Sequence, residues 1–192
     1  MSLEISSLTK VYGNKTVLSS LDLSVGGGIF AITGPSGCGK TTLFKILCGL
    51  EKYDSGSFQY NDRCSVVFQE ARLFPWLNLR ENVTSVTGCS VKQAEELLDM
   101  LGLGDDFLKY PHEVSGGMQR RTAIARALSV NAGLYLFDEP LAGLDAELKS
   151  VFCEILKSRI EKSKTVLVIS HELEEIKRSA DHIYTMKDGI LI

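Results

Sequence analysis

The chain has 192 residues, of which 44% are hydrophobic, and its 21 Lys and Arg against 24 Asp and Glu give a formal net charge of −3. At about 150 residues per domain, this length predicts one compact domain with room for a substantial core and an inserted subdomain. The composition excludes disordered and fibrous chains, and the lack of a basic surplus argues against nucleic acid as a partner.

The predicted elements alternate between strands and helices. Alternating apolar residues predict a strand over residues 21–25, and short apolar runs predict strands over 29–33, 65–68, 134–137 and 165–170. A helix follows the second strand, in which Leu43, Phe44, Ile46, Leu47 and Leu50 recur at helical spacing, and Gly49 with Asp54-Ser55-Gly56 marks its exit. This order predicts an α/β fold with a mostly parallel sheet.

The region from residue 78 to 128 is predicted to be an inserted helical subdomain. One of its helical faces carries Ala94, Leu97, Leu98 and Leu101. Near the end of the chain, two short apolar runs flank Lys187-Asp188-Gly189, whose Asp-Gly pair predicts a hairpin.

No targeting or membrane-spanning segment is evident. The longest uncharged stretch, residues 23–39, is broken by six glycines and a proline, so it is too interrupted to span a bilayer. The N-terminus lacks a basic region followed by an apolar one, which predicts a cytoplasmic protein. Five widely spaced cysteines without a C-x-x-C pair favour reduced thiols with packing roles over disulfides or a zinc site.

A phosphate-binding loop lies between the strand at 29–33 and the helix that follows. It fits G-x-x-x-x-G-K-[ST] and consists of Gly34, Pro35, Ser36, Gly37, Cys38, Gly39, Lys40 and Thr41. Its backbone N–H groups and the helix end predict an anion site, in which Lys40 reaches the β- and γ-phosphates of ATP, Thr41 binds Mg²⁺ and Thr42 meets the α-phosphate side. The alternative is a glycine-rich turn with an incidental lysine.

Two acids end the strand at 134–137. At the carboxyl edge of a buried parallel strand, Asp138 can hold Mg²⁺ and Glu139 can act as the general base for an attacking water. The alternative is an ordinary loop opening, since Asp-Glu-Pro is common in loops.

A second glycine-assisted helix start follows Val114. Ser115, Gly116 and Gly117 precede an apolar helical pattern that ends at Leu128. A chain with one complete phosphate loop and one spare anion-binding helix end suggests a head-to-tail dimer in which each spare end closes on the other chain's nucleotide. The alternative is a plain helix cap.

These motifs together resemble the ATP-binding subunits of ABC transporters over essentially the whole chain. In their order along the chain, Gln69 looks like the Q-loop glutamine, Asp145 lies in a segment like the D-loop, and His171 looks like the switch histidine. Tyr12 is similar to the aromatic residue that stacks on adenine. The residues around Gln69 and Leu73, together with Met118, resemble those of the nitrate, sulfonate and taurine importer branch.

The resemblance implies a role for each of these residues. Gln69 would contact Mg²⁺ or the attacking water, and His171 would bind the γ-phosphate and help to hold the water. Each has an alternative: a surface-loop glutamine for Gln69, an incidental polar residue for His171 and a packed core aromatic for Tyr12.

The resemblance also implies the fold and its divisions. It predicts one ABC ATPase domain over 1–192, with a P-loop NTPase (RecA-like) core at about 1–76 and 129–192. The core includes an N-terminal antiparallel β subdomain, and the helical subdomain occupies about 77–128.

An apolar segment between the two parts predicts a docking surface. Leu73, Phe74 and Trp76 cluster around a proline, and by resemblance they receive a helix of a transmembrane permease. The alternative is packing between the core and the helical subdomain.

The sequence thus predicts an ATPase that dimerises around two MgATP, with itself or a homologous ATPase. It would power solute transport, favoured as import, from the inner face of the membrane, and it would work indirectly with a solute-binding protein. Two rival hypotheses are a soluble ABC ATPase that acts as a mechanical switch in repair, translation or cluster assembly, and a P-loop kinase of small molecules.

Overall fold

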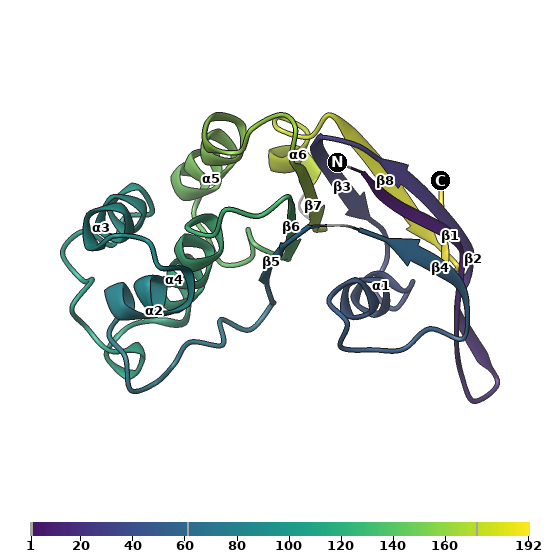
Figure 1. The fold of residues 1–192 in the computed structure, drawn as a ribbon, viewed down its shortest axis with the longest axis horizontal. Helices are drawn as coiled ribbons and strands as arrows, with labels where there is room; N and C mark the ends of the chain where they lie inside the picture. Colours follow the sequence, from purple (N-terminus) through teal and green to yellow (C-terminus); the bar gives the residue numbers. More distant parts are fainter. Residues whose placement is uncertain (1, 61, 172) are drawn as a thin grey trace.

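A computed structural model describes residues 2–60, 62–171 and 173–192 (Figure 1). Its strands form two sheets. The smaller, antiparallel sheet has the order β2-β1-β4, made of β1 (Leu3–Tyr12), β2 (Lys15–Val25) and β4 (Ser55–Gln59). The larger sheet has the order β5-β6-β7-β3-β8-β9, made of β5 (Cys64–Val67), β6 (Leu134–Asp138), β7 (Thr165–Ile169), β3 (Gly28–Thr33), β8 (His182–Lys187) and β9 (Ile190–Leu191).

The larger sheet is parallel from β5 through β8, and only β9 adds an antiparallel edge. The predicted strands and the mostly parallel sheet are confirmed, as is the N-terminal antiparallel part. The hairpin at the end of the chain is also confirmed, because β8 and β9 pair across Asp188 and Gly189. These two residues have φ of 49° and 80°, which an Asp-Gly turn of the primed type requires.

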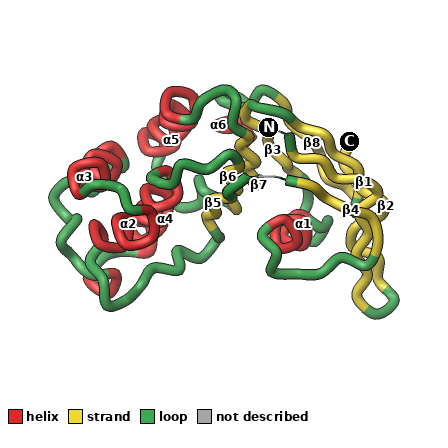
Figure 2. The backbone as a smooth tube through the Cα atoms, viewed as in Figure 1, coloured by secondary structure: helices red, strands yellow, loops and turns green. Residues whose placement is uncertain are grey.

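The helices gather mainly on one side of the larger sheet (Figure 2). They are α1 (Lys40–Leu47), α2 (Leu79–Thr87), α3 (Val91–Met100), α4 (Gly116–Leu128), α5 (Ala146–Arg159) and α6 (Leu173–Ile176), with a 3-10 turn at Pro111–Glu113. Figure 1 shows α1 apart from the others, beneath the sheet formed by β1, β2 and β4.

The predicted end of α1 at Gly49 is confirmed, but Leu50 does not share the buried face of the helix. Gly49 has φ of 71°, and the backbone N–H groups of Gly49 and Leu50 donate to Ile46 O and Lys45 O, at 2.9 and 2.8 Å. This pair of bonds is a Schellman stop, in which a left-handed glycine turns the chain away from the helix axis. Leu50 is therefore 55% exposed.

Two hydrophobic clusters cover the two faces of the larger sheet. Along β6, Tyr135 and Phe137 point into a cluster with helices α3, α4 and α5, whereas Leu134 and Leu136 point into a cluster with α1, β1 and β2. Successive side chains of a strand face opposite sides, so a strand buried on both faces is apolar throughout.

The helical region between residues 78 and 128 packs through the face that was predicted. Its apolar residues Ala94, Leu97, Leu98 and Leu101 are buried. They share one cluster with Phe137 of the sheet, so the helical part and the sheet have a common core on that side. The division at about 76 and 128 remains a prediction.

Within the described residues, no helix is long and apolar enough to cross a membrane. The structure joins none of the five cysteines, all of which it describes, in a disulfide. The packing role is seen for the buried Cys38 and Cys153, but Cys64 is exposed, so that part of the prediction is wrong for it.

Candidate functional site

Strand order brings the predicted site residues to one edge. The strands β5, β6, β7 and β3 are neighbours in the sheet, although they are far apart in the chain. Their carboxyl ends lead into Gln69, Glu139, His171 and the loop at Gly34. Ligands of open parallel sheets bind outside this edge, so four separate motifs face one region.

The phosphate-binding loop has a backbone that only glycine allows at two points. Gly34 has φ of 148°, and a β-carbon there would lie 2.2 Å from Met186 O. Gly39 has φ of 116°, and its β-carbon would lie 2.8 Å from Val17 O. Any side chain at either position would displace the loop from β8 or β2, so the glycines are required by geometry and not by composition alone. The geometry of the loop therefore does not favour the alternative of an incidental glycine-rich turn.

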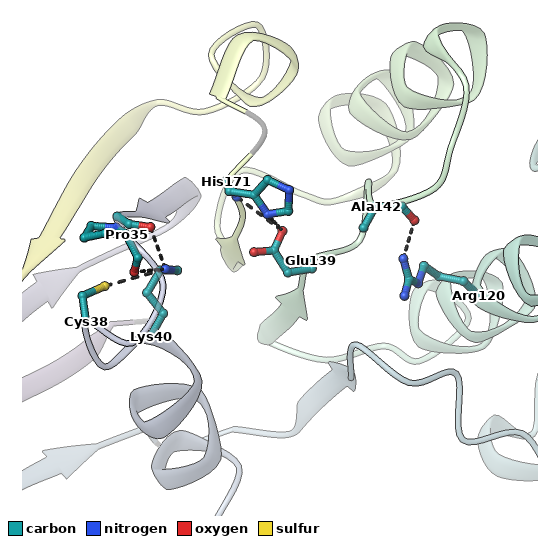
Figure 3. Close-up of polar contacts among 8 residues, drawn as sticks. Pro35, Cys38, Lys40, Arg120, Glu139, Ala142 and His171 are labelled. Atoms are coloured by element: carbon teal, nitrogen blue, oxygen red, sulfur yellow. Dashed lines mark hydrogen bonds and ion pairs between the residues drawn. The ribbon is translucent and has the colours of Figure 1, made fainter.

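Lys40 stands inside this loop. Its ammonium donates to Gly34 O at 2.7 Å and to Pro35 O at 3.0 Å, with Cys38 Sγ at 3.6 Å (Figure 3). The helix α1, which Lys40 begins, has no side-chain cap and no acidic residue in its first turn. Its first N–H groups and the positive end of its dipole are thus available to an anion.

A second group of site residues surrounds an open pocket of about 210 Å³. The pocket is lined by Thr41, Gln69 and Asp138, the three residues predicted as metal ligands. Burial raises the pKa of Asp138, and the nearby charge of Glu139 raises it further, whereas Lys40 and Lys45 oppose both effects. A carboxylate that is 5% exposed beside a hydroxyl and an amide oxygen fits a hard cation such as Mg²⁺, whose other ligands come from water and phosphate.

Glu139 and His171 form a pair at the centre of the edge. The Nδ1 atom of His171 lies 2.9 Å from Oε2 of Glu139, and the His171 backbone N–H donates to the same oxygen at 3.3 Å (Figure 3). Glu139 has φ of 49°, which costs about 1–2 kcal/mol for a residue with a β-carbon. Its backbone N–H donates to Ile169 O at 2.8 Å, so β7 helps to hold the strained turn.

The predicted second anion site lies elsewhere in the molecule. Ser115 accepts a hydrogen bond from the Met118 N–H at 3.3 Å, so it does cap α4, as the plain-cap alternative requires. Among the described residues, and apart from its chain neighbours and the backbone of its own helix, no atom lies within 4 Å of a β-carbon built on Gly116, so the glycine still faces open space. Figure 1 shows α4 and α1 on opposite sides of β5, so the two helix starts lie in separate parts of this chain.

Asp145 and Tyr12 have local roles that the sequence did not reveal. The Asp145 carboxylate caps α5 by accepting from the Leu148 N–H at 2.9 Å. Tyr12 ends β1 and is 45% exposed, which contradicts the packed-core alternative. The Lys10 ammonium lies 4.8 Å from the centre of the Tyr12 ring and 3.0 Å from Glu51. The Lys10–Glu51 ion pair thus holds a cation beside the exposed ring.

Of the predicted docking residues, Trp76 projects from the surface, whereas Leu73 and Phe74 are half-buried. Trp76 is 69% exposed and packs against Phe74 at 5.5 Å between ring centres, which does not favour the interior-packing alternative for Trp76. The fully buried Asn82 holds the segment. Its side chain accepts from Phe74 N at 2.8 Å and donates to Phe74 O and Leu77 O at 3.1 and 2.9 Å.

Two arginines of α4 contact segments of the site, although neither was predicted from the sequence. Arg126 donates to Ala71 O and Arg72 O at 3.1 and 3.0 Å, and Arg120 donates to Gln69 O at 2.7 Å. The sequence offered one indication of this role. Arg126 lies between Ala125 and Ala127 on a buried helix, where a charged residue needs specific partners.

Comparison with known proteins agrees with this geometry. The ABC transporter family matches residues 18–142, more than half of the chain. An aliphatic sulfonates import ATP-binding protein of Paracoccus denitrificans is 37% identical over an alignment of 190 positions, which covers 96% of this chain and 78% of that protein. An Fe(3+) ions import ATP-binding protein of Photobacterium profundum is 36% identical over an alignment of 209 positions, which covers 96% of this chain and 58% of that protein.

A solved structure shows the same fold. The dimeric post-hydrolysis state of the ATP-binding cassette MJ0796, bound to ADP and Pi, has a TM-score of 0.88 and 30% sequence identity, and the match covers 98% of this chain and 96% of that one. The likeness to sulfonate import subunits agrees with the branch that the motifs around Gln69 resemble.

Proposed function

The chain belongs to the ATP-binding subunits of ABC transporters, and from that premise we propose that it hydrolyses ATP as a head-to-tail dimer to power solute import through a separate membrane partner. The observation that carries the proposal is the convergence of Lys40 and the Glu139–His171 pair on one sheet edge. The relatives are named as import subunits, so the soluble-switch alternative is not favoured.

ATP binding would rest mainly on charge and backbone donors. When the triphosphate enters the loop, the Lys40 ammonium would exchange Gly34 O and Pro35 O for phosphate oxygens. The uncapped N–H groups of α1 would add donors that need no reorganisation. The exposed ring of Tyr12 offers a face for the adenine.

Hydrolysis would depend on the Glu139–His171 pair. In the observed pair, the Nδ1–H group of His171 donates to the carboxylate, which orients Glu139 while leaving its other oxygen free to accept a proton from water. The opposite nitrogen, Nε2, remains available for a phosphate oxygen. Positioning and charge stabilisation supply most of the catalysis in phosphoryl transfer, and this pair supplies both.

Thr41, Gln69 and Asp138 would hold Mg²⁺. They surround one pocket, and Asp138 is a buried acid. The ion would neutralise charge on the phosphates. Gln69 would also report the state of the site, because it lies between the metal pocket and the docking segment that begins at Leu73.

The metal proposal predicts a specific effect of Thr41→Val, which removes the hydroxyl and keeps the shape. The Mg²⁺ concentration that gives half-maximal ATPase activity should rise about tenfold, as expected when one ligand worth about 1.4 kcal/mol is lost. A Mg²⁺ titration at saturating ATP measures it. The exposed Thr16→Val serves as the control, and an unchanged Mg²⁺ dependence in Thr41→Val would exclude Thr41 as a ligand.

The membrane partner would dock on Leu73, Phe74 and Trp76. Exposed aromatic side chains are the usual anchors of protein interfaces, and a stiff segment loses little entropy on binding. The buried Asn82 supplies that stiffness. This docking would place the chain peripherally on the inner face of the cell membrane, with a solute-binding protein acting on the opposite face.

The docking surface predicts that Trp76→Ala releases the chain from its partner. When the chain is co-expressed with its permease partner, the wild type should sediment with membranes, and Trp76→Ala should weaken the association about 30-fold, equivalent to about 2 kcal/mol. The ATPase activity of the purified variant should be unchanged. The control is Ile192→Ala, because Ile192 is 70% exposed, about as much as Trp76. A variant that pellets like the wild type would refute the docking role.

The solute is proposed only as a class. The likeness to an aliphatic sulfonates import protein favours an oxyanion, whereas the Fe(3+) import protein is nearly as similar. Two relatives with different named solutes and nearly equal identity indicate that the cassette itself does not recognise the solute.

A further inference from the structure

One arginine joins three of the segments that serve the proposed reaction. Arg120 lies in the first turns of α4, soon after Ser115. Its Nη2 donates to Gln69 O at 2.7 Å, and its Nη1 donates to Ala142 O (Figure 3). The guanidinium therefore connects the start of α4, the segment after β5 and the segment after β6.

The carbonyl of Ala142 belongs to the turn that carries Glu139. The Ala142 N–H donates to Glu139 O at 3.3 Å, so a shift of Ala142 moves the backbone of Glu139. Glu139 itself is held at φ of 49°. A strained backbone persists only where its surroundings hold it, and Arg120 supplies a contact from outside the turn.

The start of α4 also lies directly beside this turn. A β-carbon built on Gly117 would lie 3.8 Å from Gly143 O, the carbonyl next to Ala142. A movement of the glycines at Gly116 and Gly117 is therefore passed to Ala142 through two routes, backbone proximity and the Arg120 side chain. The planar fork of an arginine presents its donors in a fixed geometry, whereas a lysine ammonium rotates on a flexible stem.

We infer that Arg120 is a positioning residue that couples the start of α4 to Gln69 and to the Glu139 turn. This inference rests on the proposed function. In the head-to-tail dimer, engagement of Gly116 and Gly117 by the other chain's nucleotide would be transmitted through Arg120, which completes the arrangement of Glu139. The guanidinium of Arg120 is engaged by two backbone carbonyls of its own chain, so its loss should affect the catalytic step and spare ATP binding.

The neighbouring Arg121 provides a matched control. It also donates two hydrogen bonds to backbone carbonyls, to Leu101 O at 2.7 Å and Gly102 O at 3.1 Å. Both partners lie in the loop after α3, away from Gln69 and Ala142. A purely structural clip predicts similar consequences for the two arginines, whereas coupling predicts that they differ.

The test measures kcat, the Kd for ATP and the melting temperature of the full chain for Arg120→Ala, Arg120→Lys and Arg121→Ala. Arg120→Ala should lower kcat about tenfold or more and change the Kd for ATP less than threefold. Arg120→Lys should recover part of kcat, because one of the two contacts can be kept. Arg121→Ala should lower the melting temperature about as much as Arg120→Ala does. Its kcat should stay within about twofold of the wild-type value.

Two results would overturn the inference. One is an Arg120→Ala variant with wild-type kcat, and the other is an equal loss of kcat in Arg121→Ala. If Arg120→Ala does not fold, Arg120→Lys decides alone, since wild-type kcat in it contradicts the need for a two-carbonyl fork. A wild-type chain without ATPase activity would instead refute the proposed function.

Discussion

Replacing Glu139 with glutamine is expected to lower kcat for ATP hydrolysis by about 10²–10⁴-fold, the usual contribution of a general base. Glutamine keeps the size of the side chain and can still accept the hydrogen bond from His171 Nδ1, but it cannot take a proton from water. ATP binding should remain near the wild-type level, because the loop around Lys40 is untouched. Bound ATP should then accumulate in a closed dimer.

The measurements are steady-state ATPase activity, ATP affinity and the dimer fraction by size-exclusion chromatography with and without ATP. Glu96→Gln removes the same charge from an exposed position of α3 and should behave as the wild type. Normal turnover in Glu139→Gln would mean that another group activates the water. A variant that hydrolyses slowly and stays monomeric in ATP would separate the base role from the dimer.

Replacing Lys40 with alanine should weaken ATP binding by about 30-fold or more, equivalent to at least about 2 kcal/mol for a lost charged hydrogen-bonding partner. The ammonium lies within the loop and donates to two of its carbonyls, so the substitution also removes contacts that shape the loop. In contrast to Glu139→Gln, this variant should lose binding and dimerisation together.

Fluorescent-nucleotide titration measures the affinity, and the melting temperature with excess ATP gives an independent value, because a ligand that binds only the folded state stabilises it. Lys92→Ala removes an exposed charge of α3 and should keep wild-type affinity. Wild-type affinity in Lys40→Ala would assign the anion site to the α1 helix end and the loop backbone alone.

The reach and the limits of prediction are clearest in the phosphate loop and at two residues, Leu50 and Arg120. The fold of the phosphate loop was predictable, since G-x-x-x-x-G-K-T places glycines where the observed φ at Gly34 and Gly39 excludes side chains. Leu50 was misplaced, because helical spacing continues past a glycine that in fact reverses the chain. Arg120 was not predicted, since its partners are the backbone carbonyls of Gln69 and Ala142. Every residue has such a carbonyl whatever its side chain, so the residue types do not reveal the contact.

The sequence by itself determined which chemical groups this protein has: a phosphate loop, an acid pair at a strand end and two glycine-assisted helix starts. Those features depend on local backbone demands and on which residues follow apolar strands, and both are written in neighbouring residues. Only the tertiary structure decided which groups meet. The order β5-β6-β7-β3 brings Gln69, Glu139, His171 and Lys40 to one edge, and that order arises from packing both faces of the sheet, which no short stretch of chain encodes.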